Sequence, residues 1–257
     1  MRLAYRLKSA GRAALWHLAG SVLVAAGAAA LVWGLWYPPP YDALSGGMHL
    51  FGLLVGADLV CGPLLTLVLY TPRKPRSELR RDLGLVGLLQ VTALLYGLWT
   101  VVEARPVFLA FEGDRFRIVS AADIEPGDLP NALPQFHKLG YGGPQVIAVR
   151  VARADDVDFL RSLELSLHGL DPALRPSAWR PYADVKEAVL AKARPLESLK
   201  ARHPEHAEEI ERLRTRTELP SERIGYLPVQ GRGARFWTAL IALEDARVIG
   251  FLPLDGF

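Results

Sequence analysis

The sequence predicts a membrane protein in which three transmembrane α-helices are followed by an α+β extracytoplasmic domain with an antiparallel sheet. Apolar runs of membrane-spanning length occupy residues 13–36, 48–70 and 83–102. The chain is 51% hydrophobic, which is too apolar for one soluble domain and too polar for a chain that lies wholly in the membrane. Residues 103–257 instead alternate like strands at both ends. We therefore expect a membrane domain over residues 1–102 and a second domain over residues 103–257.

The first predicted span, residues 13–36, follows a basic amino terminus that contains Arg2, Arg6, Lys8 and Arg12. A secretory signal has a similar basic start, and the three alanines at 28–30 resemble a cleavage site. The apolar run is 24 residues long, however, whereas the apolar region of a signal peptide spans about 7 to 15 residues. We interpret this segment as an uncleaved anchor.

The second predicted span, residues 48–70, reads MHLFGLLVGADLVCGPLLTLVLY. At about 1.5 Å of rise per residue it is about 34 Å long, enough to cross a hydrocarbon core about 30 Å thick. Asp58 lies near its middle. An acid at that depth costs about 2.5 to 3.5 kcal/mol on insertion scales, so we expect Asp58 to face protein or trapped water rather than lipid.

The loops around the third predicted span, residues 83–102, predict the orientation. The loop at 37–47 has no Lys or Arg and carries a cluster of aromatic residues, while the loop at 71–82 has five basic residues. Basic loops stay in the cytoplasm. We therefore predict a bacterial inner-membrane protein with a cytoplasmic amino terminus and with residues 103–257 in the periplasm.

The net charge of +3 follows the same division. Residues 1–102 hold nine Lys/Arg against four Asp/Glu, and residues 103–257 hold 21 against 23. The basic excess therefore belongs to the membrane half and reports topology. It gives no support for a nucleic-acid partner.

The second domain is predicted to begin with a strand hairpin over 107–111 and 115–120 and to continue with a strand over 145–151. A three-stranded meander over 224–229, 234–243 and 246–254 ends the chain, and we expect these strands to meet in one antiparallel sheet. The predicted helices cover residues 155–167, 182–193 and 204–216. The first of them has apolar residues at helical spacing, namely Val157, Leu160, Leu163 and Leu167.

Two interpretations of Asp58 stay open. It is a polar contact for a partner's transmembrane segment, or it hydrogen-bonds internally and fixes how the three helices pack. Counted from the outer membrane face, Asp58 and Thr92 lie at a depth of about 15 Å and Gln90 at about 18 Å. Gln90 and Thr92 of the third span are therefore candidate internal partners of Asp58. Proton or ion transport is less favoured, because no second acid or base forms a relay and His17 is predicted to lie too near the cytoplasmic end.

The remaining candidates on the second span are small or helix-bending residues. Gly52 and Gly56 form a GxxxG spacing, which permits close approach of another helix inside the bundle or from a partner. Gly62 lies on the same helical face as Asp58, and Pro63 disturbs the backbone beside it. These residues predict helix packing rather than chemistry.

No motif predicts catalytic, cofactor-binding or metal-binding residues. The one cysteine, Cys61, lies inside an apolar run, where a packed thiol is expected. His203 and His206 flank a proline in a charged stretch, which favours a surface turn over a metal site. The segment GYGGP at 140–144 precedes a strand, so it does not form a phosphate loop. We expect no enzymatic activity, no cofactor and no small-molecule substrate.

Several segments, in the same order and spacing, resemble the TfpX/TfpZ family of type IV pilin accessory proteins. The specific ones are WYPPPY (36–41), HLFGLLVGADLVCGPLLTLVLYTP (49–72), DLGLVGLLQVTALLYGLWTV (82–101) and ARPVFLAFEGDRFRIVSAADI (104–124), and VIGFLPLD (248–255) adds a weaker likeness. The resemblance covers about the first half of the chain. Residues 125–220 carry no matching motif.

The resemblance implies an inner-membrane, chaperone-like accessory protein that stabilises or presents a type IV pilin before pilus assembly. Its implied partners are the lipid bilayer and the pilin, met through both the pilin's transmembrane helix and its globular head. In this hypothesis the three helices shelter the pilin helix, and Asp58 offers it a hydrogen bond or counter-charge. The alternative is a membrane-anchored periplasmic sensor or an enzyme of unknown substrate. A sensor needs a cytoplasmic output element, and the predicted cytoplasmic segments are short.

Overall fold

The computed structural model describes residues 2–46, 48–233 and 235–257 and divides the chain into two compact units. The first, the helical unit, comprises Met1–Asp42 and Gly46–Ala104. The second, the sheet unit, comprises Ala43–Ser45 and Arg105–Phe257.

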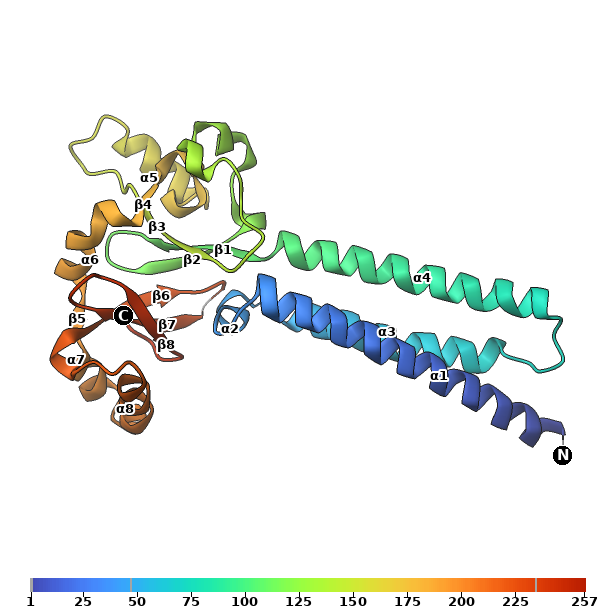
Figure 1. Cartoon of the computed structure of the whole chain (residues 1–257). Coiled ribbons are helices and arrows are strands. Elements are labelled where there is room, and N and C mark those ends of the chain that lie inside the picture. The colour runs from blue at the N-terminus through green and yellow to red at the C-terminus, as the bar shows by residue number, and fades with distance from the viewer. Residues whose placement is uncertain (1, 47, 234) are drawn as a thin grey trace. The chain divides into compact units, whose positions relative to one another are not determined.

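The helical unit contains three helices long and apolar enough to cross a membrane, as the sequence predicted (Figure 1). They are α1 (Arg2–Leu31), which continues as a π-helical segment over Val32–Trp36, α3 (Met48–Leu69) and α4 (Arg76–Glu103). The helices α1 and α4 begin well before the predicted spans, because hydropathy marks where a helix becomes apolar and not where it starts. A short helix, α2 (Tyr41–Ser45), was not predicted.

The central helix is α3, which packs against both α1 and α4, whereas α1 and α4 make few contacts with each other. A Cβ added at Gly97 would lie 2.2 Å from the Leu54 side chain, so this glycine permits the close approach of α3 and α4. Near the same end, the Tyr37 hydroxyl donates a 2.9 Å hydrogen bond to the Val101 carbonyl. These contacts leave α1 and α4 on two sides of α3.

The sheet unit is built on one sheet that has, among the described residues, eight strands. Their order is β4-β3-β1-β2-β6-β7-β8, and β5 pairs beside β6. The strands are β1 (Pro106–Phe111), β2 (Phe116–Ser120), β3 (Gln145–Val149), β4 (Trp179–Pro181), β5 (Arg194–Pro195), β6 (Ile224–Gln230), β7 (Phe236–Ala242) and β8 (Val248–Leu252). The hairpin and the final meander were predicted. Ala234, where one predicted strand begins, lies outside the described residues.

The prediction of a purely antiparallel sheet is wrong, because β1 pairs with β3 and β2 pairs with β6 in parallel. Ser120 at the end of β2 lies opposite Pro106 at the start of β1. The chain then takes residues 121–144 to reach β3, which starts beside Phe108 and runs alongside β1. Alternation of apolar residues reports which faces are buried and not the direction of a neighbour, so the sequence did not reveal these parallel pairs.

Two buried clusters hold the sheet unit together. One surrounds β1, β3 and β4, where the rings of Phe108 and Trp179 lie 4.7 Å apart. The other packs Leu199 of α7 (Leu196–Arg202) and Ile210 of α8 (Ala207–Arg216) against β6, β7 and β8. Of these two helices, α8 was predicted and α7 was not. The predicted helix at 182–193 is realised as a 3-10 turn, Tyr182–Val185, followed by α6 (Lys186–Lys192).

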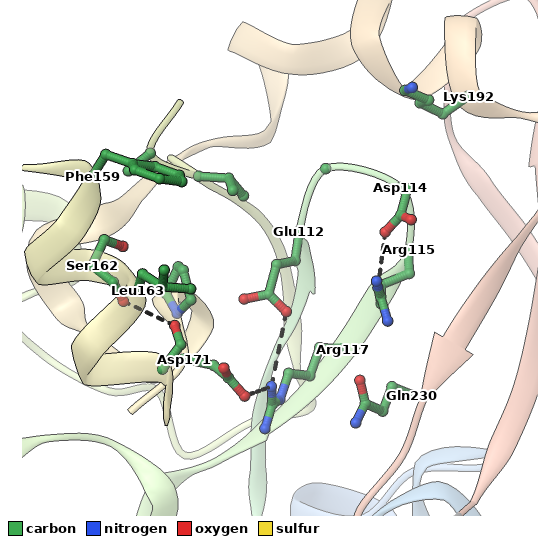
Figure 2. A pocket seen from close by; sticks show the side chains of 15 residues that line it. Glu112, Asp114, Arg115, Arg117, Phe159, Ser162, Leu163, Asp171, Lys192 and Gln230 are labelled. Atoms are coloured by element: carbon green, nitrogen blue, oxygen red, sulfur yellow. Dashed lines mark hydrogen bonds and ion pairs between the residues drawn. The ribbon is translucent and has the colours of Figure 1, made fainter. Parts of the chain in front are cut away.

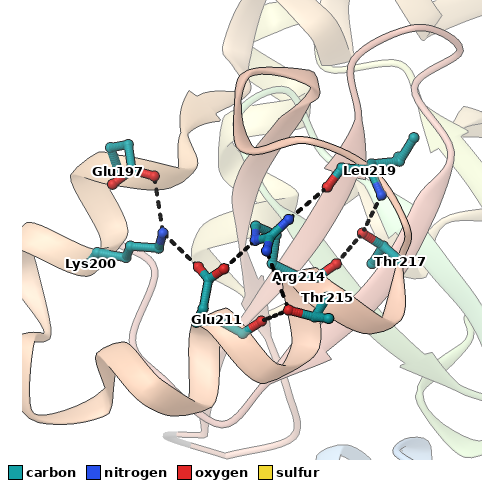
Figure 3. A network of polar contacts seen from close by, with 7 residues as sticks. All are labelled: Glu197, Lys200, Glu211, Arg214, Thr215, Thr217 and Leu219. Atoms are coloured by element: carbon teal, nitrogen blue, oxygen red, sulfur yellow. Dashed lines mark hydrogen bonds and ion pairs between the residues drawn. The ribbon is translucent and has the colours of Figure 1, made fainter.

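A polar network ties α7 to α8 (Figure 3). The Lys200 ammonium group donates hydrogen bonds to Glu197 at 3.0 Å and to Glu211 of α8 at 2.9 Å. Arg214 also donates to Glu211, at 2.5 Å, and to the Leu219 carbonyl at 3.2 Å. The hydrogen bond from Lys200, followed by the effect of Arg214, lowers the pKa of Glu211 below its ordinary value.

The helix predicted at 155–167 is α5 (Phe159–Leu167), and the four apolar residues of the predicted stripe, of which Val157 precedes the helix, do not face the core. Val157, Leu160, Leu163 and Leu167 are 106%, 76%, 49% and 80% exposed, whereas Ser162 is buried. The helical spacing was therefore recognised correctly, but the apolar face of the helix is its outer face.

Candidate functional site

A chain of polar side chains joins the three helices of the helical unit. His17 of α1 places Nε2 2.7 Å from the Gln90 Oε1 of α4 and Nδ1 2.5 Å from the Thr66 hydroxyl of α3. Since an amide oxygen only accepts, His17 Nε2 is the donor to Gln90. The Gln90 amide nitrogen donates to the backbone oxygen and to Oδ1 of Asp58, each at 3.3 Å. Asp58 is thus connected to α1 through Gln90.

Two neighbours on α3 lie beside the contact between Gln90 and Asp58. A Cβ at Gly62 would lie 2.1 Å from Gln90 Nε2 and 2.6 Å from its Cδ, so only glycine leaves room for this side chain. Pro63 lies inside α3 and has no N–H to offer the carbonyl of Leu59. Gln90 donates to the carbonyl of Asp58, one residue earlier in the chain. Gly62 and Pro63 therefore belong to the surroundings of Asp58.

The structure does not bring every predicted residue to this cluster. Thr92 is exposed on α4, and its hydroxyl donates to the carbonyl of Leu88 within the same helix at 2.9 Å. Gly52 and Gly56 are exposed, and nothing outside the local helix lies within 4 Å of a Cβ built on either one. They therefore make no close packing contact inside the helical unit. Of the two internal partners proposed for Asp58, only Gln90 contacts it.

His17, which was predicted to lie too near the cytoplasmic end to take part in a proton relay, contacts Thr66 and Gln90 in the structure. Side chains on a helix lean towards its amino terminus, which brings the Gln90 side chain towards His17. Thr66 was missed as well, although it is the one serine or threonine in the second span.

An open groove of about 280 Å³ lies between α1 and α4, beside this cluster. Asp58 lines it from α3, and small residues on the two outer helices, Gly20, Ser21 and Gly87, lie along it. The Oδ2 atom of Asp58 has no hydrogen-bond partner within residues 2–46, 48–233 and 235–257. The groove therefore offers a carboxylate oxygen and a wall of small residues to a group from outside the chain.

The sheet unit has a separate cavity of about 620 Å³, formed by the β1–β2 turn, α5 and α6 (Figure 2). Glu112 lies in it, accepting a 3.3 Å hydrogen bond from the Ala173 amide and facing Arg117 at 3.9 Å. Arg117 also pairs with Asp171. Burial raises the pKa of Glu112 above its ordinary value, and the charge of Arg117 only partly opposes this.

The histidines near residue 203 are part of a surface turn. His203 lies 3.6 Å from Glu205, and His206 lies 3.3 Å from Glu209. Among the residues that the structure describes, no group of three or more His, Cys, Asp or Glu side chains is placed to hold a metal ion.

Comparison with known proteins gives matches along nearly the whole chain. The family described as fimbrial assembly protein FimB matches residues 5–46. The fimbrial assembly proteins of serogroup I and serogroup E1 from Dichelobacter nodosus are each 33% identical over 242 residues, which cover 94% of this chain and 93% of the relative. That of serogroups C1 and C2 from the same organism is 42% identical over 116 residues, covering 45% of this chain and 88% of the relative. No solved structure matches the chain significantly.

Proposed function

Because the chain belongs to the fimbrial assembly protein family, we propose that it is an accessory protein that stabilises a type IV pilin subunit in the membrane before pilus assembly. The three long apolar helices and the family name both fit a protein of the inner membrane. The closer relation to the TfpX/TfpZ accessory proteins is part of the proposal. The role is one of binding, with no cofactor and no turnover.

In the proposed mechanism the pilin's transmembrane helix lies in the groove between α1 and α4. Small residues such as Gly20 and Gly87 let two helix backbones approach closely, which is how helices associate where the solvent is already apolar. Asp58 then supplies a hydrogen bond or counter-charge to a polar group on the pilin helix. The globular head of the pilin, outside the membrane, meets the sheet unit.

The observation that carries this proposal is the incomplete hydrogen bonding of the Asp58 carboxylate. Its Oδ1 accepts one hydrogen bond of 3.3 Å, while no described residue satisfies Oδ2, which belongs to a side chain lining the groove. A carboxylate oxygen without a partner at mid-membrane depth is costly. A packing role alone leaves that oxygen unused, whereas a partner helix in the groove satisfies it.

The proposed orientation places the amino terminus and the basic residues 71–82 in the cytoplasm and the sheet unit in the periplasm. Single cysteines introduced at Ser77 and at Ser198, in a chain with Cys61→Ala, test it by labelling with a membrane-impermeant reagent. We expect labelling of intact spheroplasts at position 198 and not at position 77. The reverse pattern would contradict the orientation.

A bulky side chain that fills the groove tests whether the pilin helix binds there. We expect Gly87→Leu and Asp58→Asn to lower pilin abundance and surface piliation in a strain that requires the protein. Thr92→Leu is the matched control, because it adds similar bulk to an exposed position of the same helix. A photo-crosslinking residue in place of Ser21 should give an adduct with the pilin helix. Unchanged piliation in Gly87→Leu, or equal loss in Thr92→Leu, would count against the groove.

A further inference from the structure

The helix α5 is amphipathic, but its apolar face is exposed and its polar face packs against the rest of the sheet unit. A row of exposed apolar side chains consists of Val157, which lies two residues before the helix, and of Leu160, Leu163 and Leu167 on the helix. Its inner face carries the buried Ser162, whose hydroxyl accepts a 2.7 Å hydrogen bond from the Arg175 guanidinium. Turning the leucines inwards would break that bond and place Arg175 against apolar side chains, so the row is held outwards. We call these four residues the α5 row.

Large contiguous apolar patches on a protein surface commonly mark sites that bind another molecule. The α5 row continues into the cavity of the sheet unit, because Phe159 and Leu163 form one wall of it (Figure 2). A second cavity of about 610 Å³ shares Val151 and Ala152 with the first. The apolar row and the two hollows therefore form one continuous surface.

The charges around the two cavities indicate the chemistry of the partner. Most of the ionic side chains there are already matched, since Arg117 pairs with Asp171 and Arg150 pairs with Asp156 and Asp158. Three cations at the cavities, Lys192, Arg153 and Arg180, form no ion pair with any residue in the described part of the chain, against one such carboxylate, Asp184. A surface with apolar side chains and unmatched cations suits a polypeptide segment that carries apolar residues next to carboxylates.

We propose that the α5 row and these two cavities are the docking surface for the globular head of the pilin, and that the docked segment is apolar and acidic. This inference rests on the proposed function and adds a second contact to the groove. Lys192, Arg153 and Arg180 receive the carboxylates of the head, and the α5 row covers its apolar residues. A docked head removes the exposed leucines from water, which is the main source of the binding energy.

An anionic membrane surface could also cover an apolar helix face. The negative charges beside the α5 row would repel such a surface. Asp155 and Glu164 are exposed next to the leucines, whereas the unmatched cations line the two cavities. Helices that lie on anionic membranes instead place Lys and Arg along the polar face. The observations therefore favour a protein partner.

The test uses the full-length chain in nanodiscs of phosphatidylcholine and the soluble head of the strain's major pilin, made without its transmembrane helix. We expect the double variant Leu160→Ser/Leu167→Ser to weaken head binding by at least about tenfold, as loss of central apolar contacts does. The variant Lys192→Glu should weaken it as well. The matched control is Arg161→Ser/His168→Ser, which changes one exposed polar position on α5 and one at its C-cap and should leave the affinity unchanged.

A photo-crosslinking residue in place of Leu160 identifies the occupant in cells. An adduct with the pilin head supports the proposal, and an adduct with lipid or with a second copy of the chain overturns it. Equal affinity of wild type and the double leucine variant overturns it too. Asp58→Asn separates this surface from the groove, since it should reduce piliation while leaving binding of the isolated head unchanged. If Asp58→Asn leaves piliation unchanged while the isolated head still binds to the α5 row and the cavities, the groove is refuted and the docking surface is not.

Discussion

Replacing Gly62 by alanine tests how the polar cluster holds the three helices together. The new Cβ would lie 2.1 Å from Gln90 Nε2 and 2.7 Å from Oε1, well inside van der Waals contact. Gln90 must then move and give up its hydrogen bonds to Asp58 at 3.3 Å and to His17 at 2.7 Å. We therefore expect a loss of stability that acts through Gln90 and not through Gly62 itself.

The size of the effect follows from two opposing terms. A polar contact between membrane helices is worth about 0.6 kcal/mol on average, so the contacts of Gln90 together contribute about 2 kcal/mol. Alanine is a better helix former than glycine by up to about 1 kcal/mol. Gly62→Ala should thus lower the free energy of unfolding by about 1 kcal/mol. In a Gln90→Ala background the clash is absent, and the same substitution should instead raise it by up to about 1 kcal/mol.

The measurement is unfolding of the full-length protein in mixed micelles with rising detergent denaturant, followed by circular dichroism. Gly56→Ala is the matched control, since no atom outside the local helix lies within 4 Å of its built Cβ. It should be neutral or stabilising. The reversal of sign between the two backgrounds is the decisive result. If Gly62→Ala is equally destabilising with and without Gln90, the clash lies elsewhere and the reasoning fails.

Two further outcomes follow from single contacts. Gly97→Ala should destabilise the helical unit in the same assay, because its Cβ would lie 2.2 Å from the Leu54 side chain, and a compensating Leu54→Ala should recover much of the loss; no recovery would argue against this contact. Burial raises the pKa of Glu112, so its contribution to stability is present below its unfolded-state pKa and is lost as pH rises through the raised value. The thermal unfolding temperature of Glu112→Gln, measured between about pH 4 and pH 8, should therefore fall less with rising pH than that of the wild type; parallel profiles would contradict this.

The parts of the fold that depend on burial along one element were predictable. Runs of apolar residues revealed the three long helices, and alternation revealed the hairpin and the final meander. The parallel partner of β1 was not predictable, because β3 reaches it after residues 121–144 and no local pattern encodes that path. The two-residue strand β5 gives no periodic signal at all.

Some residues of the candidate site could likewise be predicted from the sequence, and others could not. Gln90 was identified because it is the most polar residue of its span, and polar residues at such depth need partners. Thr92 lies at a similar depth, but it is on the opposite side of α4 and bonds its own helix. Depth comes from residue counting, whereas the facing side depends on how α4 packs against α3. The contact between His17 and Gln90 likewise depends on how α1 and α4 are placed relative to each other, and no local pattern encodes that.

The helix α5 shows where the pattern itself misleads. Helical spacing of Leu160, Leu163 and Leu167 predicts a buried stripe in an isolated soluble domain. The opposite face holds Ser162, which bonds Arg175, so the polar face is the one that packs. A local rule broken in this way, with a polar partner that compensates for it, is expected where a surface serves binding.

The two sequence interpretations of Asp58 are compatible once its two carboxylate oxygens are considered separately. Oδ1 accepts from Gln90, which links Asp58 to His17 and so to α1. Oδ2 remains available at the groove between α1 and α4. Gln90 therefore positions the carboxylate that a partner helix would meet, and a partner that drew Asp58 away would also strain the link between α1 and α4. In this arrangement occupancy of the groove and packing of the three helices are coupled through one side chain, Gln90.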